Sequence, residues 1–475
     1  MLFNSYIFIF LFLPITLCLF YYAIGKSNQF AKIALVSCSL VFYTWWNPGN
    51  LPILLSSIVV NYFLGEALKR GASQRLLVIG ISLNLIYLGI FKYTNFILQN
   101  VSLLQGALFE PLNIVLPLAI SFFTFQQIAY LVDCKRGLVG KNSVYDYLLF
   151  VTFFPQLIAG PIVHHREMMP QFSQLKRNGF AERLGLGTFI FAIGLFKKCF
   201  IADNFAIWAN AGFSYNDSLS FFEAWFTSLS YTFQLYFDFS GYVDMATGCA
   251  LMFGIRLPVN FNSPYKSSNI QDFWRRWHIT LGRFLRDYLY IPLGGSRATA
   301  YKTYINLTIT FGLAGLWHGA SWMFVIWGLL HAFALIIHRI WQYTGVSLPK
   351  VIAWLITFNF VNLTWIFFRA EDLDQAYRII RGMLGLEGIV WPLFLNRLFA
   401  GTSLNTGDWL AALTGNILTV IAVFLALTIC LTAKNSNQFA VDWRPSRGWA
   451  AASAVLLVIG IASLAVESPF LYFNF

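Results

Sequence analysis

The sequence predicts an all-α fold, a polytopic membrane helix bundle of about 11 to 13 membrane segments. Three observations support this. Of 475 residues, 58% are hydrophobic and only 11% are charged, whereas a soluble domain carries about 25% charged residues. Long apolar runs recur from one end of the chain to the other. Lysine and arginine gather in every second connecting loop, as they do in proteins that cross a membrane repeatedly.

The apolar runs define the expected membrane segments in chain order. The first run does not have the pattern of a signal peptide, because it lacks a basic start, is too long, and has no small-residue cleavage pattern before Lys26. One further run, 147–163, contains Pro155, Gly160 and Pro161, so we expect a broken or re-entrant segment there. The other runs are 2–24, 33–46, 51–65, 76–98, 112–132, 184–202, 224–253, 304–316, 320–338, 351–368, 416–433 and 449–466.

The basic residues predict the orientation. The connecting segments at 47–50, 99–111 and 203–223 contain no Lys or Arg, which places them and the N-terminus outside the cytoplasm. The segment 256–302 is strongly basic and is expected to be cytoplasmic. After Arg369 the pattern gives no orientation. The net charge of +12 is therefore explained by loops that face an anionic leaflet, and we expect no nucleic-acid partner. The basic loop residues are Lys26, Lys32, Lys69, Arg70, Arg75, Lys135, Arg136, Lys141, Arg256, Lys266, Arg275, Arg276, Arg283, Arg286, Arg297 and Lys302.

The chain is expected to form one integral membrane domain, 1–475. Its longest weakly apolar stretches, 256–302 and 369–415, are too short to fold independently. No internal repeat is visible, which argues against the inverted-repeat architecture of many transporters. The six cysteines are scattered without a C-x-x-C pair, and the adjacent His164 and His165 make a poor chelate, so no metal site is expected.

Two carboxylates lie within the apolar run 224–253. Asp238 and Asp244 are separated by about 120° around a helix, so they do not form a side-by-side acid pair. Two interpretations remain open: each carboxylate pairs with an arginine or caps a broken helix, or both line a polar cavity. Asn260 and Asn262 follow shortly after.

Two histidines stand out beyond this run. His278 follows Trp274 and Arg275 in a stretch typical of an interfacial helix, at the point where the basic segment should re-enter the bilayer. His318 follows Trp317 and lies near glycines between two apolar runs. A lone histidine on an apolar face is usually a hydrogen-bonded core residue, but glycines let backbone or ligand approach closely, and imidazole transfers protons near neutral pH.

The stretches 237–296 and 315–321 closely resemble the membrane-bound O-acyltransferase family, in particular its bacterial branch of alginate O-acetylation proteins and teichoic-acid D-alanyl transferases. The segments 154–162 and 472–475 are similar to the same branch. The resemblance covers most of the chain and is densest across about 150–340. It implies a helix bundle with re-entrant helices around a transmembrane tunnel, located in the bacterial cytoplasmic (inner) membrane.

The resemblance also implies an enzyme that moves an acetyl or other acyl group from a cytoplasmic thioester to an extracytoplasmic hydroxyl. The donor would be acetyl-CoA or an acyl carrier protein, with no tightly bound cofactor. The family's two histidines match His318 and His278, and we expect His318 to deprotonate the acceptor. The expected substrate-binding residues are Asp238, Asp244, Asn260, Asn262, Trp274, Arg275 and Trp317.

The acceptor is expected to be an exopolysaccharide similar to alginate, reached directly or through an esterase-like acetyl-accepting protein. Two alternatives stay open. The chain could transfer D-alanyl or another acyl group to a cell-wall polymer, or it could be a transporter or flippase without chemistry of its own, because intramembrane Asp and His residues also serve ion paths.

Overall fold

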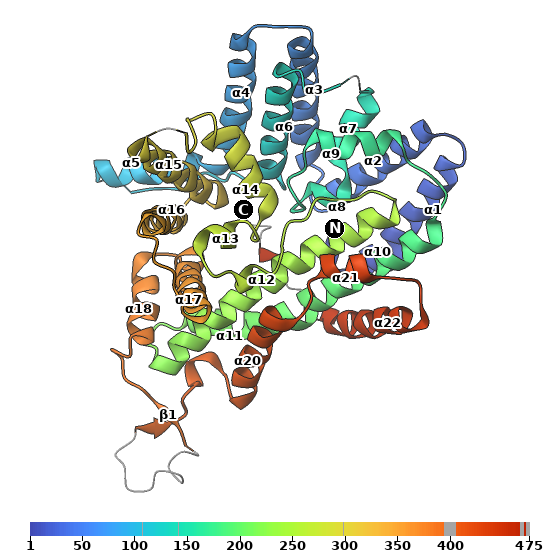
Figure 1. Ribbon diagram of the computed structural model, residues 1–475. Coiled ribbons are helices and arrows are strands. Elements are labelled where there is room, and N and C mark those ends of the chain that lie inside the picture. The colour runs from blue at the N-terminus through green and yellow to red at the C-terminus, as the bar shows by residue number, and fades with distance from the viewer. Residues whose placement is uncertain (107, 141, 298, 394–404, 466–469, 472–475) are drawn as a thin grey trace.

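The protein is nearly all helical (Figure 1). The computed structural model describes residues 1–106, 108–140, 142–297, 299–393, 405–465 and 470–471. Within these ranges the strands are two short parallel segments, β1 (Trp391–Pro392) and β2 (Thr406–Gly407). The 472–475 segment, which resembles the acyltransferase branch, lies outside the described residues. The prediction of an all-α chain is confirmed.

The N-terminal third forms helices that pack onto a buried N-terminus. Phe3 is buried and stacks on Tyr242 with ring centroids 4.9 Å apart. The predicted run 112–132 is corrected, because its helix begins only at Ile120, after Pro111 and Pro117, whose rings restrict the preceding backbone. The helices are η1 (Phe8–Phe12), α1 (Leu13–Ile24), α2 (Asn28–Thr44), α3 (Asn50–Lys69), α4 (Gln74–Lys92), α5 (Thr94–Gln105) and α6 (Ile120–Lys135).

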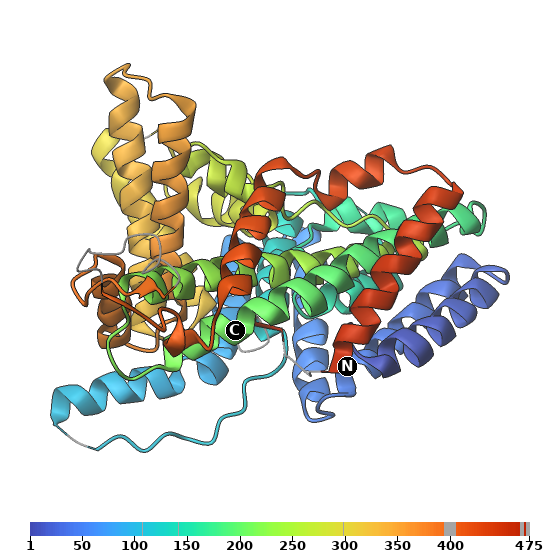
Figure 2. The ribbon, with the colours of Figure 1, turned by 90° about the horizontal axis from the view of Figure 1, so that it is seen from below.

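The middle of the chain supplies the centre of the molecule. The broken segment expected at 147–163 is confirmed, because α7 ends at Thr152 and only one further turn forms before Gly160. The long α12 crosses the molecule in both views (Figures 1 and 2) and packs on α10. The helices are α7 (Val144–Thr152), α8 (Phe154–Leu157), α9 (His165–Ser173), α10 (Phe180–Leu195), η2 (Phe196–Ala202), α11 (Asp203–Ser214) and α12 (Phe221–Met252).

The C-terminal half begins with short helices and continues with longer ones. The short helices are η3 (Pro264–Lys266), α13 (Ile270–Trp274), α14 (Ile279–Leu285) and η4 (Arg286–Tyr290). They are followed by α15 (Ala300–His318), α16 (Trp322–Tyr343), α17 (Lys350–Arg369), α18 (Leu373–Met383), η5 (Ala411–Leu413), α20 (Ile417–Thr432), α21 (Ser436–Asp442), α22 (Arg447–Ala462) and η6 (Ser463–Ala465).

Among the described residues, five helices are long and apolar enough to cross a membrane, and a sixth span forms if the bent pair α20 and α21 is counted as one. The protein is therefore a multi-pass membrane protein. Other predicted runs form shorter apolar helices, such as Phe8–Ile24 and Arg447–Ala462. The five are Asn50–Lys69, Gln74–Lys92, Phe180–Ser214, Trp322–Tyr343 and Lys350–Arg369.

Contacts relate the last helices to the basic segment 256–302. The indole of Trp354, near the start of α17, donates to the Tyr265 carbonyl at 2.9 Å. The Lys266 ammonium donates to the carbonyl of Ala433, between α20 and α21, at 2.9 Å. The start of α17 and the end of α20 therefore lie beside Tyr265 and Lys266 of this segment, and Arg369 lies at the opposite end of α17.

Candidate functional site

His318 and His278 meet at one buried place although they are distant in sequence. His318 is 2% exposed and His278 is fully buried. Both rings pack against the indole of Trp317, with ring centroids 5.0 Å from His318 and 6.3 Å from His278. The structure thus brings together three residues that the sequence singled out.

Gly319 allows α15 to end at His318. It adopts an extended conformation, with φ −164°, and the ring of Phe324 occupies the space that a Cβ would need there. Aromatic rings also enclose the imidazole, since Trp327 and Phe368 lie 5.0 and 5.1 Å from His318. Aromatic rings therefore pack closely around the His318 imidazole.

His278 is held in a left-handed conformation. Its φ of 43° and ψ of 51° are costly for a residue with a Cβ, and such strain persists only where the surroundings enforce it. Asn260 supplies much of this support, because its carbonyl accepts from the Ile279 amide at 3.0 Å and its Oδ1 accepts from the Thr280 hydroxyl at 2.9 Å. Asn260 therefore supports the site by fixing the backbone beside His278.

Trp274 lies next to the site and is oriented by His331. Its indole donates to His331 Nδ1 at 3.3 Å. The other ring nitrogen, Nε2, lies 3.1 Å from the Thr364 hydroxyl, which itself donates to the Val361 carbonyl at 2.8 Å. Thr364 must then accept from Nε2, so His331 is a neutral imidazole with both nitrogens satisfied. It is a structural residue that positions Trp274.

The two carboxylates of α12 are paired with lysines, where arginine partners were one expected possibility. Lys198 lies 2.8 Å from Asp238 and 2.7 Å from Asp203. Lys197 lies 2.7 Å from Asp244, which also accepts from the Ser436 hydroxyl. Both lysines come from the π-helical segment η2. Asp244 and Asn260 also line a small cavity of about 20 Å³, so pairing and cavity lining coexist at Asp244.

Asn262 and Arg275 lie at the surface, apart from the buried histidines. The Asn262 side chain accepts from the Asn435 amide at 2.9 Å and so connects the segment after α12 to the start of α21. Arg275 follows α13 with an exposed side chain. Neither residue joins the group around Trp317.

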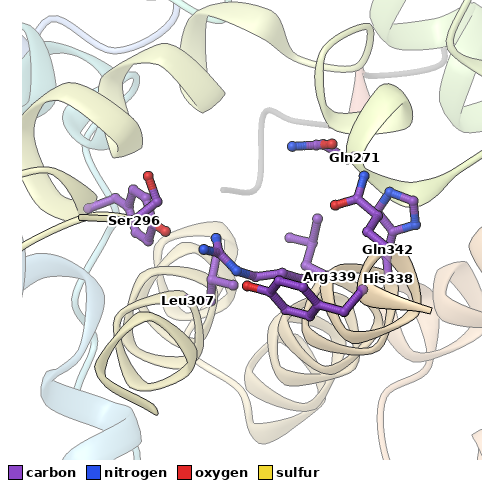
Figure 3. A pocket seen from close by; sticks show the side chains of 9 residues that line it. Gln271, Ser296, Leu307, His338, Arg339 and Gln342 are labelled. Carbon is purple, nitrogen blue, oxygen red and sulfur yellow. The ribbon is translucent and has the colours of Figure 1, made fainter. Parts of the chain in front are cut away.

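A larger cavity of about 590 Å³ lies between α13, η4, α15 and α16 (Figure 3). Leu307 and His338 line it, and they lie roughly 16 and 24 Å along their helices from the turn that carries His318, at a rise of about 1.5 Å per residue. The wall comprises Gln271, Tyr290, Ser296, Leu307, Leu335, His338, Arg339, Gln342 and Tyr343.

Sequence inspection missed Lys92, Tyr93 and Ser121, which contact the end of α15. Lys92 is the last residue of α4 and lies beside Trp317. Its charge at the end of an apolar helix was the available signal, but a lysine at such an end usually reaches the membrane surface.

Comparisons with known proteins give a consistent result. Residues 73–369 match the model of the membrane-bound O-acyltransferase family. A peptidoglycan O-acetyltransferase of Helicobacter pylori is 47% identical over 100% of this chain and 98% of its own. A protein of Azotobacter vinelandii named "Probable alginate O-acetylase AlgI" is 37% identical over the whole of both chains. A teichoic acid D-alanyltransferase of Bacillus subtilis is 28% identical over 56% of this chain and 72% of its own.

Proposed function

The chain belongs to the membrane-bound O-acyltransferase family, and we propose that His318 is the base that deprotonates the acceptor hydroxyl in its reaction. The observation that carries this proposal is the buried group of His318, His278 and Trp317. A hydroxyl is a weak nucleophile at neutral pH, and a positioned base accelerates its attack about 10²–10⁴-fold.

The reaction balances without a cofactor. The acceptor oxygen bonds to the acyl carbon as the carbon–sulfur bond breaks, and the proton passes from the hydroxyl to His318 and then to the departing thiolate. The enclosing rings of Trp327 and Phe368 exclude water, which would otherwise hydrolyse the thioester. His278 orients the donor carbonyl, and Asn260 keeps His278 in place.

The 590 Å³ cavity is our candidate for the donor's polar end. Arg339 offers a planar, permanent cation, suited to the phosphates of acetyl-CoA or of an acyl carrier's prosthetic arm. Figure 3 shows Arg339 between Leu307 on one side and His338 and Gln342 on the other. Trp274, whose ring centroid lies 5.9 Å from that of Trp327, then lines the route from this cavity to His318.

The acceptor is a polysaccharide on the far side of the bacterial inner membrane, with the N-terminus extracytoplasmic and the segment 256–302 in the cytoplasm. Relatives named for peptidoglycan and for alginate both match the whole chain, at 47% and 37% identity. The higher identity favours peptidoglycan strands as the first acceptor to assay, and the alginate-like exopolysaccharide expected from the sequence is the second. An esterase-like protein is the candidate relay.

A turnover assay tests the role of His318. Protein in nanodiscs is incubated with labelled acetyl-CoA and peptidoglycan or alginate, with and without a relay protein. We expect transfer by the wild type and none by His318→Ala. His165→Gln is the matched control, because His165 is also buried but contacts Leu138 and Asp133 and not the group around Trp317, and it should retain most activity. Full activity of a folded His318→Ala variant would refute the assignment.

The donor cavity has its own test. Arg339→Glu should raise the donor KM at least tenfold and change kcat little, because it acts at the polar end of the donor. Arg275→Glu provides the comparison, since Arg275 is exposed outside the cavity wall. An unchanged KM for Arg339→Glu would exclude this cavity, and a raised KM for Arg275→Glu alone would support the donor contact that the sequence predicted.

A further inference from the structure

The helix that carries His318 is capped by side chains from another segment. The last carbonyls of any α-helix have no partner within the helix. At the end of α15, the Tyr93 hydroxyl donates to the Leu316 carbonyl at 2.8 Å. The Lys92 ammonium donates to the carbonyl of Trp317 and, at 3.4 Å, to that of His318. Three successive carbonyls are therefore held by the α4–α5 junction.

The same ammonium also fixes the neighbouring helix. Lys92 Nζ donates to the Ser121 hydroxyl at 3.1 Å and lies 5.8 Å from the centre of the Trp317 indole. The Trp317 indole in turn donates to the Ser121 carbonyl at 3.4 Å. All three protons of the ammonium thus have acceptors, and its charge stands at the negative end of the α15 dipole.

We propose that Lys92 is a positioning residue for acyl transfer, holding the backbone of Trp317 and His318 so that the His318 imidazole faces the reacting hydroxyl. This inference rests on the proposed role of His318. The backbone of His318 sits at the last position of its helix, immediately before Gly319, where a helix end frays most easily. Lys92 contacts this end of α15 through the carbonyls of Trp317 and His318.

A purely structural cap and a positioning residue differ in what their loss changes. Loss of a structural cap lowers the unfolding temperature and the amount of active protein. Displacement of the base by about 1 Å costs about 10²-fold in rate, while donor binding at the distant cavity is unaffected. The two are separated by kcat against KM, measured per folded molecule.

The experiment compares substitutions at Lys92 with one control, at Lys69, and with one substitution at the neighbouring Tyr93, all in nanodiscs. Lys92→Met removes charge and donors, Lys92→Gln keeps an uncharged donor, and Lys92→Arg keeps both. Lys69→Met is the matched control, because Lys69 also ends its helix, pairs with Glu66 at 2.8 Å and lies over a tyrosine ring. Tyr93→Phe removes the bond to Leu316, two residues before the base.

We expect Lys92→Met to lower kcat 30- to 100-fold with a donor KM within twofold of wild type. Lys92→Arg should restore kcat to within fivefold of wild type, and Lys92→Gln should lie between Met and Arg. Lys69→Met should stay within threefold of wild type, and Tyr93→Phe should lower kcat less than Lys92→Met does. If Lys92→Met does not fold, the other two variants test the proposal, which requires a higher kcat for Lys92→Arg than for Lys92→Gln. Equal kcat for Arg, Gln and wild type would overturn the proposal.

The outcomes distinguish this inference from the proposed function. If His318→Ala is as active as the wild type, His318 is not the base, and Lys92 then has no base to position. Loss of activity in His318→Ala together with wild-type kcat in the Lys92 variants refutes the positioning role alone.

Discussion

At the residue scale, His164 belongs to a buried polar cluster that joins α6, α9 and η4, outside the membrane-spanning segments. Its Nδ1 lies 3.1 Å from the Tyr288 hydroxyl, which donates to Asp133 at 2.8 Å. Asp133 also lies 3.3 Å from His165. Burial raises the pKa of Asp133, but the hydrogen bonds from His165 and Tyr288 outweigh it, so the carboxyl's pKa is lowered overall.

The cluster makes stability depend on pH. Burial, followed by the charge of Arg283, lowers the pKa of His164 from 6.5 to about 4. Between these values the unfolded chain binds the proton and the folded chain does not, so stability rises with pH across pH 4 to 6.5. Because pH 5 lies about 1.5 units below 6.5, we expect His164→Gln to reduce the difference in stability between pH 8 and pH 5 by about 2 kcal/mol, as measured by unfolding at the two pH values. An unchanged slope would contradict the assignment to His164.

His278 allows a second prediction at this scale. Its positive φ disfavours any residue with a Cβ, while glycine adopts it freely. Both His278→Gly and His278→Ala remove the imidazole and should lose most activity. His278→Gly should nevertheless be more stable than His278→Ala by about 1 kcal/mol, measured by thermal unfolding in detergent. A more stable alanine variant would show that the backbone relaxes after substitution.

The sequence led to His318 because histidine and glycine between apolar runs are conspicuous. It led to His278 because this residue lies where the basic segment should re-enter the bilayer, and the family resemblance added Trp317 as a substrate-binding residue. The sequence did not lead to Lys92, whose role depends on where α4 ends relative to α15. Contacts between helices that are distant in sequence follow from packing, which residue types alone do not encode. The same holds for Lys197 and Lys198, whose carboxylate partners lie on a different helix.

At the scale of elements, two glycines set the distance between α15 and α16. A Cβ at Gly315 would collide with the Phe324 carbonyl, and one at Gly328 with the Phe311 carbonyl. Backbones approach this closely only where small residues face each other. The turn of His318 and Gly319 connects these two helices, so their spacing positions the base.

Gly328→Ala should therefore separate the helices. We expect a loss of roughly 1–3 kcal/mol of stability, as for other overpacked cores, and at least a tenfold lower kcat. Gly312→Ala is the control on α15, because its Cβ would meet only Leu329 at 3.6 Å, and it should be neutral or stabilising. Unfolding temperature and transfer rate measure both effects, and equal behaviour of the two variants would exclude the packing argument.

The apolar runs predicted the helix boundaries well where a run was uniformly apolar, and predicted them poorly where a proline interrupted the run. The run 184–202 matches α10 and η2 closely. In the run 112–132, the residues before Ile120 do not form a helix. Hydropathy does not distinguish an apolar extended segment from an apolar helix, because both suit lipid or a protein core. Proline at 111 and 117 was the signal that separates them.

At the scale of the whole molecule, contacts between helices extend the orientation that the charges predict to the residues after Arg369. Lysine and arginine predict that 256–302 is cytoplasmic. The bonds from Trp354 to Tyr265 and from Lys266 to Ala433 place the start of α17 and the end of α20 beside that segment. Because α17 runs from Lys350 to Arg369 and is long enough to cross a membrane, we expect the residues that follow Arg369 to emerge on the opposite face.

This arrangement predicts which residues a membrane-impermeant maleimide reaches. The three positions chosen for labelling are exposed. Glu371 follows the far end of α17, Lys434 follows α20, and Lys302 lies in the basic segment. We expect Glu371→Cys to be labelled in intact cells, and Lys434→Cys and Lys302→Cys only after permeabilisation; the wild type, with its native cysteines, gives the background. If the cysteines at 302 and 434 are labelled under the same condition, the contact between α20 and the basic segment is supported. The side of the membrane from which both are labelled tests the orientation that the lysine and arginine residues predict. Labelling of Lys434→Cys together with Glu371→Cys would contradict the packing of α20 against the basic segment, whereas a reversal of all three would leave the packing intact and invert the protein in the membrane.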